Sequence, residues 1–385
     1  MRFSVDAHAI GQHLTGNETY IRNLLNAFAV LDQSSDFIAY ISRSGMPGDL
    51  PERFLKRPVS ANPFVRLGVD LPRRLRQDRP KLLHVQYTAP VFCPTPVVVS
   101  VHDVSFLEHP EYFTAFRAVQ LRCTVQRTVK LASRILTASE FSKRSILAAY
   151  HLRDEKVVVV PNGVSSAFRP LSRDSARRFV KPVLGFDNPF ILTVGDLQPR
   201  KNHLGLIQAF EQLVRSHPEL THHLVLVGKE SWHGSVVREA AKASSAASRI
   251  HFAGFVTDED LHQFYGACDL FVYPSFYEGF GLPILEAMAC GRAVACSNTS
   301  AMPEVADSAA ILFDPASTHQ LVLAMRDLLL NPELRTRMER LATQRAALFS
   351  WERTASKTLE LYYECAGEVH LARPTVTRSA SAARS

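Results

Sequence analysis

Two glutamates that bracket a glycine-rich turn are the side chains in this sequence whose spacing most favours chemistry. Glu278 and Glu286 have seven residues between them, beginning Gly279-Phe280-Gly281-Leu282-Pro283. Glycine permits a tight turn and proline suits the first position of a helix, so the pattern predicts a helix N-terminus between the carboxylates. The free N–H groups of such a terminus favour a phosphate or a sugar oxygen. The simpler alternative is an ordinary strand–loop–helix crossover.

A basic pair, Arg200 and Lys201, lies in a second predicted turn between a strand and a helix. Gly195 and Pro199 precede the pair and fit a tight, fixed loop. Arginine grips phosphate oxygens through two parallel hydrogen bonds, and lysine adds a point charge. A solvated basic pair is the alternative, but a helix N-terminus disfavours cations. An anionic ligand therefore explains the pair better.

Two further loops follow predicted strands. His102 comes after an apolar run, where it could donate a hydrogen bond to a substrate hydroxyl or accept its proton. The alternative is a packed histidine tied to Asp103 or to the backbone. Gly254-Phe255-Val256 could present its backbone to a nucleobase, whereas Thr257 or Asp258 after it is explained by helix capping.

Alternating strands and helices must position these loops. Apolar runs predict strands at 2–6, 37–41, 82–85, 97–101, 134–137, 156–160, 190–194, 223–227, 249–252, 269–273, 293–297 and 310–313. Helical spacing predicts helices at 17–31 (with Asn17 as its cap), 113–131, 139–150, 203–216, 233–246, 257–267, 282–290, 302–306, 317–330, 332–349 and 351–369. Alternation of this kind produces parallel sheets wrapped by helices, the α/β class. Ligands of such sheets bind at the carboxyl ends of the strands.

The length of 385 residues favours two domains. We expect the first at 1–170 and the second at 188–350, each with a doubly wound sheet. The charged segment 171–187 lacks a clear periodicity and is predicted to be a linker. The segment 372–385 is rich in Ser, Ala and Arg, has no periodic apolar face, and is predicted to be disordered.

The composition is that of a globular protein, with 46% hydrophobic and 21% charged residues. No apolar run approaches the ~20 residues that span a bilayer. Asp6 and His8 interrupt the apolar pattern of the N-terminus, which predicts a first strand and not a signal peptide. Six scattered cysteines fit neither a zinc site nor a disulfide framework. We therefore expect a cytoplasmic protein.

The formal net charge of +7 favours acidic partners. Basic residues gather in two segments, 66–81 and 117–130. One interpretation is a solvated face, and the other is peripheral contact with the inner face of the cell membrane or with a lipid-linked diphosphate. No aromatic-interleaved basic pattern favours nucleic acid.

Several common catalytic motifs are missing from the sequence. It contains no Walker A loop, no G-x-S-x-G turn and no H-E-x-x-H helix. Gly279-Phe280-Gly281 lacks the third glycine of the dinucleotide fingerprint, because Ile284 stands in its place. These absences argue against a nicotinamide oxidoreductase and against a zinc hydrolase.

The motifs together resemble the retaining, nucleotide-sugar-dependent glycosyltransferases of family 4, which have the GT-B fold. The Glu278-x7-Glu286 signature and the Arg200-Lys201 pair carry the resemblance most specifically. It extends to the segments 191–202, 224–228, 251–256, 303–305 and 349–352 in the second half, and to 101–103, 137–142 and 161–164 in the first. It implies two Rossmann-like domains that face each other across a cleft, with the last helix, 351–369, crossing back onto the first domain.

The resemblance also implies roles for individual residues. Arg200 and Lys201 would bind the donor diphosphate, Glu286 the ribose hydroxyls, and Glu278 and His102 the transferred sugar. The predicted catalytic residues are Glu278, His102 and Lys201. The predicted nucleotide-sugar site comprises Gly195, Arg200, Lys201, Phe255, Val256, Phe280, Gly281, Leu282 and Glu286. Gly16 and Asn17, in the turn after the first strand, are predicted on the acceptor side.

The function implied is transfer of a hexose with retention, by front-face attack, to a glycan or lipid-linked acceptor in polysaccharide biosynthesis. Mannose from GDP-mannose is the first expectation, and a UDP-linked sugar the other. Fixed cations and a helix N-terminus can stabilise a leaving diphosphate, so we expect no cofactor and no essential metal. The alternatives are a nucleotide-sugar epimerase of the same fold and a non-catalytic nucleotide-sugar-binding protein.

Overall fold

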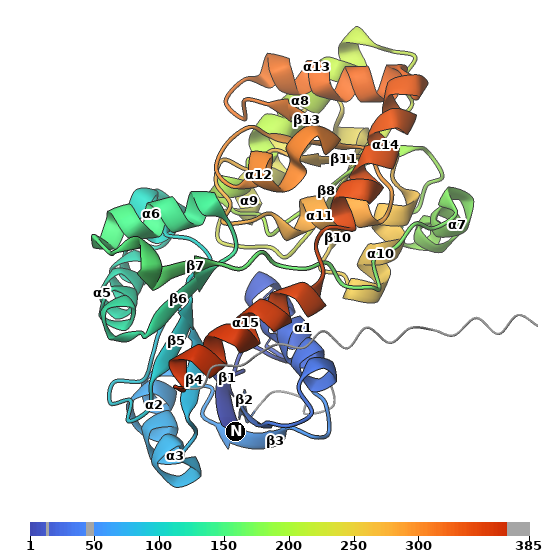
Figure 1. Cartoon of the computed structure of the whole chain (residues 1–385). Coiled ribbons are helices and arrows are strands. Elements are labelled where there is room, and N and C mark those ends of the chain that lie inside the picture. The colour runs from blue at the N-terminus through green and yellow to red at the C-terminus, as the bar shows by residue number, and fades with distance from the viewer. Residues whose placement is uncertain (13–14, 44–49, 368–385) are drawn as a thin grey trace, which may run out of the picture.

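The computed structural model describes residues 1–12, 15–43 and 50–367. Two parallel sheets, each covered by helices on both faces, form two domains joined by two crossings of the chain (Figure 1). The predicted fold class, α/β with two doubly wound domains, is confirmed. The tail predicted to be disordered, 372–385, lies outside the described residues. Within the described residues, no helix is both long enough and apolar enough to span a bilayer.

The first domain is built on a seven-stranded parallel sheet. Its spatial order is β3-β2-β1-β4-β5-β6-β7. The strands are β1 (Arg2–Asp6), β2 (Asp36–Ser42), β3 (Leu55–Val59), β4 (Leu82–Gln86), β5 (Val97–Ser100), β6 (Arg134–Thr137) and β7 (Val157–Val159). The helices are α1 (Thr15–Leu31), α2 (Pro63–Val65), a π-helical turn η2 (Arg66–Asp70), α3 (Leu71–Asp78), α4 (Ser105–Glu108), α5 (Ala115–Leu131) and α6 (Glu140–Tyr150).

The second domain repeats the arrangement with six parallel strands in the order β10-β9-β8-β11-β12-β13. The strands are β8 (Phe190–Val194), β9 (His223–Val227), β10 (Ile250–Gly254), β11 (Leu270–Tyr273), β12 (Val294–Ser297) and β13 (Ile311–Phe313). The helices are α7 (Arg173–Leu184), α8 (His203–Ser216), α9 (Gly234–Ala243), α10 (Asp258–Ala267), α11 (Leu282–Ala289), α12 (Met302–Ala306), α13 (Thr318–Leu330) and α14 (Pro332–Ala346). The last helix, α15 (Trp351–Cys365), returns to the first domain.

Each sheet is buried between two apolar layers, which explains why its strands are near-continuous apolar runs. In the first domain, α1 and α15 cover one face, while α3, α5 and α6 cover the other. In the second domain, one layer includes α7, α10, α11 and α14, and the other includes α8, α9 and α13. The carboxyl ends of both sheets carry the loops that meet between the domains.

The two crossings of the chain lie side by side. Val164 and Ser350 form an isolated parallel bridge. A side chain at Gly163 would place its Cβ 2.2 Å from the Trp351 amide nitrogen, so only glycine allows this approach. Thr354 Oγ1 donates to the Pro161 carbonyl oxygen at 2.7 Å. Helix α15 therefore starts against the outgoing crossing and packs on α1 of the first domain.

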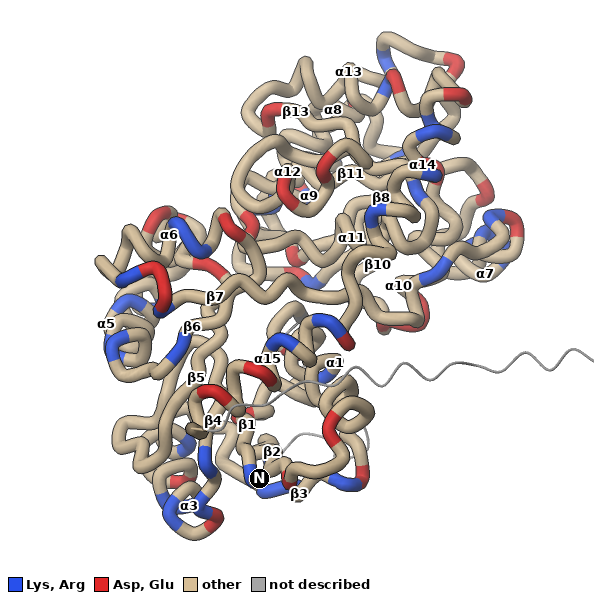
Figure 2. The backbone as a smooth tube through the Cα atoms, viewed as in Figure 1, with Lys and Arg blue, Asp and Glu red and all other residues tan. Residues whose placement is uncertain are grey.

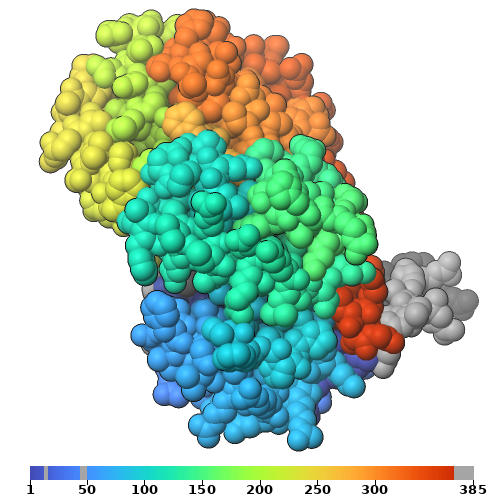
Figure 3. Space-filling view, turned by 90° about the vertical axis from the view of Figure 1, so that its left-hand side faces the viewer, coloured from blue at the N-terminus to red at the C-terminus, as the bar shows by residue number. Residues whose placement is uncertain are grey.

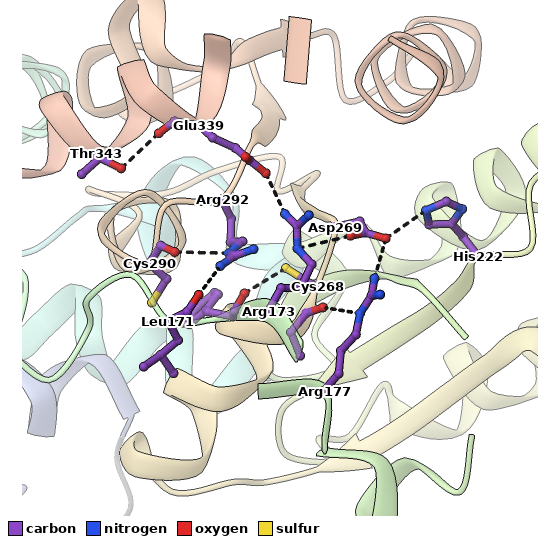
Figure 4. Close-up of polar contacts among 12 residues, drawn as sticks. Leu171, Arg173, Arg177, His222, Cys268, Asp269, Cys290, Arg292, Glu339 and Thr343 are labelled. Atoms are coloured by element: carbon purple, nitrogen blue, oxygen red, sulfur yellow. Dashed lines mark hydrogen bonds and ion pairs between the residues drawn. The ribbon is translucent and has the colours of Figure 1, made fainter. Parts of the chain in front are cut away.

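The segment 171–187, predicted as a linker, contains α7, which packs against α10 in the second domain (Figure 1). Two of its three arginines, Arg173 and Arg177, form ion pairs, whereas Arg178 is exposed. Arg177 Nη2 lies 2.9 Å from Asp269 Oδ2, and Arg173 Nη2 lies 2.8 Å from Glu339 Oε1 (Figure 4). The density of charge made the segment look like a linker, but ion pairs to residues distant in sequence hold it as part of the second domain.

Two other expectations differ from the structure. The segment between the second and fourth strands contains β3 and three helical turns that the apolar pattern did not predict. Strand β3 lies at the edge of the sheet, where Lys56, Arg57 and Pro58 are tolerated because one side is unpaired. Helix α1 begins at Thr15, so Asn17 lies in its first turn and is not its cap.

Candidate functional site

A cavity of about 460 Å³ lies between the two domains. Every residue predicted for the site lines it, from Gly16, Asn17 and His102 of the first domain to the donor-side residues of the second: Gly195, Arg200, Lys201, Phe255, Val256, Glu278, Phe280, Gly281, Leu282 and Glu286. The structure thus brings together residues that are far apart in the sequence. Their individual roles remain predictions.

The loop after β11 turns into α11 at the centre of this cavity. Gly281 has a φ of +104°, a left-handed conformation that favours glycine, and it immediately precedes α11. No side chain caps this helix, and Gly281, Leu282 and Pro283 line the cavity. The Glu278 amide donates to Ser300 Oγ at 2.9 Å, which fixes the loop from the second domain. The helix terminus predicted from the glycine pattern is therefore present and faces the cavity.

Glu278 is held between the two predicted cations. Its Oε1 accepts hydrogen bonds from Arg200 Nη1 at 2.6 Å and from Lys201 Nζ at 2.7 Å. Burial acts to raise the pKa of Glu278, but the two neighbouring cations outweigh it and hold the pKa at about 2. Glu278 is therefore a carboxylate at neutral pH and forms ion pairs with both cations.

The pKa of Lys201 is shifted in the opposite direction to that of Arg200. Burial, and then the neighbouring Arg200 guanidinium, lower the pKa of its ammonium group to about 8, although Glu278 opposes this shift. Its Nζ also donates to the Tyr273 hydroxyl at 2.5 Å. A side chain at Gly195 would touch the Lys201 chain at 3.1 Å, so this glycine leaves room for the lysine to cross the loop.

Glu286 lies on α11 in a different environment. The Tyr265 hydroxyl donates to its Oε2 at 2.9 Å. Burial raises the pKa of Glu286 to about 7, because no cation lies close enough to offset the loss of solvation. The two glutamates of the sequence motif therefore have opposite electrostatic surroundings, and only Glu278 is ionised over the whole neutral range.

The glycine next to Glu278 joins the domains. A Cβ at Gly279 would lie 2.1 Å from the His102 carbonyl oxygen. The Gly279 carbonyl accepts from Ser139 Oγ at 2.7 Å and from Ser142 Oγ at 3.1 Å, and Ser142 Oγ also contacts the His102 carbonyl at 3.0 Å. Gly279 thus allows the loop of the second domain that carries Glu278 to lie directly on the first domain, beside His102.

Helix α12 adds a second contact between the domains. The Glu304 carboxylate accepts from the amides of Glu140 at 2.8 Å and Phe141 at 3.2 Å, which are at the N-terminus of α6. A carboxylate at a helix N-terminus is favourable because it accepts otherwise unsatisfied N–H groups. This contact lies at the same interface as the Gly279 loop, so it supports the same closed arrangement.

The hydrogen bonds of His102 define which ring nitrogen carries the proton. The Gln86 amide nitrogen donates to the Asn17 carbonyl oxygen at 3.2 Å, so the Gln86 oxygen is the atom 2.9 Å from His102 Nε2. His102 must then donate from Nε2, which leaves Nδ1 as an acceptor. Burial lowers the pKa of His102 to about 4, so the ring is neutral at pH 7. Of the sequence alternatives, neither Asp103 nor the backbone is the ring's partner.

The loop after β10, which is predicted from the sequence to face a nucleobase, lies on the cavity. Phe255 and Val256 line it, as predicted. Thr257 Oγ1 accepts from the Asp260 amide, so the capping interpretation of this turn is confirmed. Asp258, also on the lining, lies 3.5 Å from Arg22 of the first domain.

Several residues of the site were not found from the sequence. They are Gln86, Tyr265, Tyr273 and Ser300, each of which fixes one of the predicted groups through contacts described above. Single polar residues in apolar segments carry no spacing signal, so no pattern pointed to them. The described residues contain no group of three or more His, Cys, Asp or Glu side chains able to hold a metal ion.

Comparison with known proteins agrees with this geometry. Residues 176–345 match the family model described as "Glycosyl transferases group 1", and residues 14–168 match "Glycosyltransferase Family 4". The chain is 32% identical over 265 residues to O-antigen chain mannosyltransferase B of Escherichia coli, an alignment that covers 69% of each protein. It is 30% identical over 232 residues to the serotype-specific mannosyltransferase WbdA of Escherichia coli, of which the alignment covers 28%.

Solved structures show the same fold. Sucrose-phosphate synthase of Thermosynechococcus elongatus superposes with a TM-score of 0.76 at 20% identity, covering 94% of this chain and 98% of that one. HepE of Anabaena, solved in complex with UDP and glucose, has a TM-score of 0.73 at 20% identity, with the same coverage. The two family models, the relatives from Escherichia coli and the two facing sheets all indicate the same family. The chain therefore belongs to the family 4 glycosyltransferases and is a transferase enzyme of the GT-B fold.

Proposed function

We propose that this enzyme transfers mannose from GDP-mannose, with retention of anomeric configuration, to a glycan or lipid-linked acceptor in polysaccharide biosynthesis. The choice of mannose rests on the mannosyltransferase relatives from Escherichia coli. A nucleotide-sugar donor is supported by the complexes of HepE with UDP and with UDP-glucose. The observation that carries the proposal is the contact of Arg200 and Lys201 with Glu278 at the N-terminus of α11.

The proposed reaction breaks the bond between the anomeric carbon and the diphosphate oxygen. Negative charge grows on the leaving diphosphate, where Arg200, Lys201 and the α11 terminus stabilise it without a metal ion. Positive charge grows on the sugar ring, where the Glu278 carboxylate stabilises it. The acceptor hydroxyl forms the new bond on the same face and gives its proton to the leaving phosphate oxygen.

Other groups of the cavity hold the donor. The Glu286 carboxylate accepts hydrogen bonds from the ribose hydroxyls, and the loop at Phe255 and Val256 faces the nucleobase of the donor. His102 accepts a hydrogen bond from a sugar hydroxyl through Nδ1, the nitrogen that its bond to Gln86 leaves free. Retaining glycosidases place a second carboxyl group across the scissile bond. We assign Glu286 to the ribose instead, which leaves only one of the two glutamates of the motif at the sugar and favours front-face attack.

The experiment is a panel of nucleotide sugars tested by thermal shift, followed by a transfer assay. A donor at a hundred times its Kd stabilises the protein by about 2.7 kcal/mol and raises Tm measurably. GDP-mannose should give the largest shift, and Glu278→Ala should abolish transfer while the protein remains folded. No shift with any nucleotide sugar would refute the proposal. Consumption of the donor without an acceptor would favour an epimerase.

A further inference from the structure

An exposed apolar surface with basic edges lies on the first domain, away from the donor side of the cavity. Three phenylalanines on it are largely in solvent: Phe64 is 70% exposed, Phe92 69% and Phe116 73%. Val65, Val69, Val91 and Val119 are also exposed. We call the surface formed by these seven residues the apolar face. Figure 3 shows their segments, coloured light blue to teal, turned toward the viewer on one side of the molecule.

The apolar face is held rigidly by contacts among its three segments. Asn62 caps α2, accepting from the amides of Phe64 and Val65, so Phe64 projects from an ordered helical turn. The Val91 amide donates to the Leu67 carbonyl at 3.0 Å, which ties the loop after β4 to η2. Ordering these backbone segments costs conformational entropy. Exposed apolar patches of this kind mark interaction sites.

Arg127 fastens the same loop to α5. Its guanidinium donates to the carbonyl oxygens of Pro90 and Val91, both at 2.9 Å. Arg127 is therefore not one of the free surface cations that its place in the basic segment 117–130 suggested. Arg66, in the other basic segment, is buried beside Asp6 and is not a surface cation either.

Four other arginines of the basic segments lie on α5, which carries part of the apolar face, and on α3, which follows η2. Arg73 and Arg76 of α3 are exposed, as are Arg117 and Arg122 of α5. None of these four makes an ion pair within the part of the chain that the structure describes, and the sequence of α5 contains no acidic residue. Figure 2 shows the basic segments of α3 and α5 on the same side of the first domain.

The site cavity reaches the edge of this surface. Arg117 and Leu121 line the cavity from α5, as does Phe113 just before this helix, while the neighbouring Phe116 is largely exposed to solvent. An amphiphilic acceptor could therefore keep its sugar in the cavity and its apolar part at the apolar face. The cavity and the apolar face are adjacent on one helix, which links the surface to the reaction.

We propose that the apolar face docks on an anionic lipid bilayer, with its phenylalanines inserted among the headgroups and the four arginines on the lipid phosphates. An anionic bilayer accounts for both the exposed apolar residues and the four arginines. Proteins that bind at a membrane interface insert apolar side chains, and their cations are attracted to anionic lipid. Docking brings the α5 edge of the cavity to the membrane, where a lipid-linked acceptor is available. This last consequence rests on the proposed function, whereas the docking does not.

Vesicle co-sedimentation of the full chain tests the proposal. Vesicles of equal parts phosphatidylglycerol and phosphatidylcholine should bind roughly several hundredfold more strongly than phosphatidylcholine alone, since each of the four arginines near the surface contributes about fivefold. The combined variant Phe64→Ser, Phe92→Ser and Phe116→Ser should lose at least about tenfold in binding. Phe179→Ser, at an exposed position on α7 of the second domain, is the matched control and should bind normally.

A charge variant separates attraction from insertion. Arg73→Glu with Arg122→Glu should weaken binding to the anionic vesicles about tenfold or more, whereas Arg337→Glu with Arg340→Glu, on the surface of α14, should not. Equal binding of all variants, or equal binding to neutral and anionic vesicles, would overturn the proposal. So would a dimer in light scattering that the phenylalanine variant dissociates, because a second copy would then cover the face. Donor-induced thermal shift, measured in the same samples, reports on the proposed function independently.

Discussion

Replacing Gly279 by alanine should separate the two domains at the loop that carries Glu278. The added Cβ would lie 2.1 Å from the His102 carbonyl oxygen, whereas real Cβ contacts are essentially never under 3.0 Å. The loop must therefore retreat by about 0.9 Å or more. Gly279 does not have a positive φ, so alanine adds no backbone strain and the effect is on the contact alone.

The size of the effect follows from the hydrogen bonds that this retreat breaks. Ser139 and Ser142 donate to the Gly279 carbonyl at 2.7 and 3.1 Å. At a net value of about 0.5–1.5 kcal/mol each, losing both destabilises the closed arrangement by about 1–3 kcal/mol. Transfer should fall by roughly five- to a hundredfold, a range that matches the loss expected from a misplacement of about 1 Å in an active site.

Two measurements distinguish this account from simple misfolding. Binding of the nucleoside diphosphate should be nearly unchanged, because Arg200, Lys201 and Glu286 all belong to the second domain. Small-angle scattering should show a larger radius of gyration for Gly279→Ala than for the native chain. A larger residue, as in Gly279→Val, should reduce transfer further. Transfer at the native rate by the alanine variant would refute the reasoning, because the two backbones would then not need to touch.

Three further predictions concern the electrostatics of the site. Burial raises the pKa of Glu286 to about 7 in the folded state, against about 4.5 in the unfolded chain. Ionisation of Glu286 therefore lowers the free energy of unfolding as pH rises from about 4.5 to 7. Above pH 7 the loss is constant at about 3 kcal/mol. Glu286→Gln should therefore raise Tm at pH 8 while weakening donor affinity, and a lower Tm at that pH would contradict this. Lys201 loses its charge above about pH 8, so calorimetric affinity for GDP should fall as pH rises through 8, whereas Lys201→Arg should give a flat profile. Gln86→Leu should lower kcat about tenfold without changing donor affinity. Gln86→Glu still accepts a hydrogen bond from His102 Nε2, so its kcat should be close to that of the native enzyme. Equal kcat in the two variants would argue that Gln86 does not control the tautomer of His102.

The sequence was informative wherever a pattern is local. Apolar runs and helical spacing predicted the alternation of elements and thus the α/β class. The pattern failed at β3, where edge position and not apolar sequence makes the strand, and at α7, where paired arginines resembled a solvated linker. Both failures have one cause, which is that burial and pairing are decided by residues distant in the chain.

The site shows the same division. The spacing of Glu278 and Glu286 and the turn at Gly281 were sufficient to predict a helix terminus beside two carboxylates. Their chemistry was not predictable, because it depends on neighbours that the motif does not contain. Arg200 is 78 residues from Glu278, and it helps to hold that carboxylate ionised. Glu286 lacks such a cation and titrates near neutrality.

The sequence by itself determined the fold class, the helix terminus at Gly281 and a part of the residues that line the cavity. Only the tertiary structure decided that Gly279 approaches the His102 backbone. Ser139, which donates a hydrogen bond to the Gly279 carbonyl, is 140 residues away in the chain. The tertiary structure also decided which nitrogen of His102 is the acceptor, and which arginines of the basic segments remain at the surface. The physical reason is that spacing along a chain specifies the geometry of one element, whereas ionisation, tautomer and exposure depend on the contacts between elements.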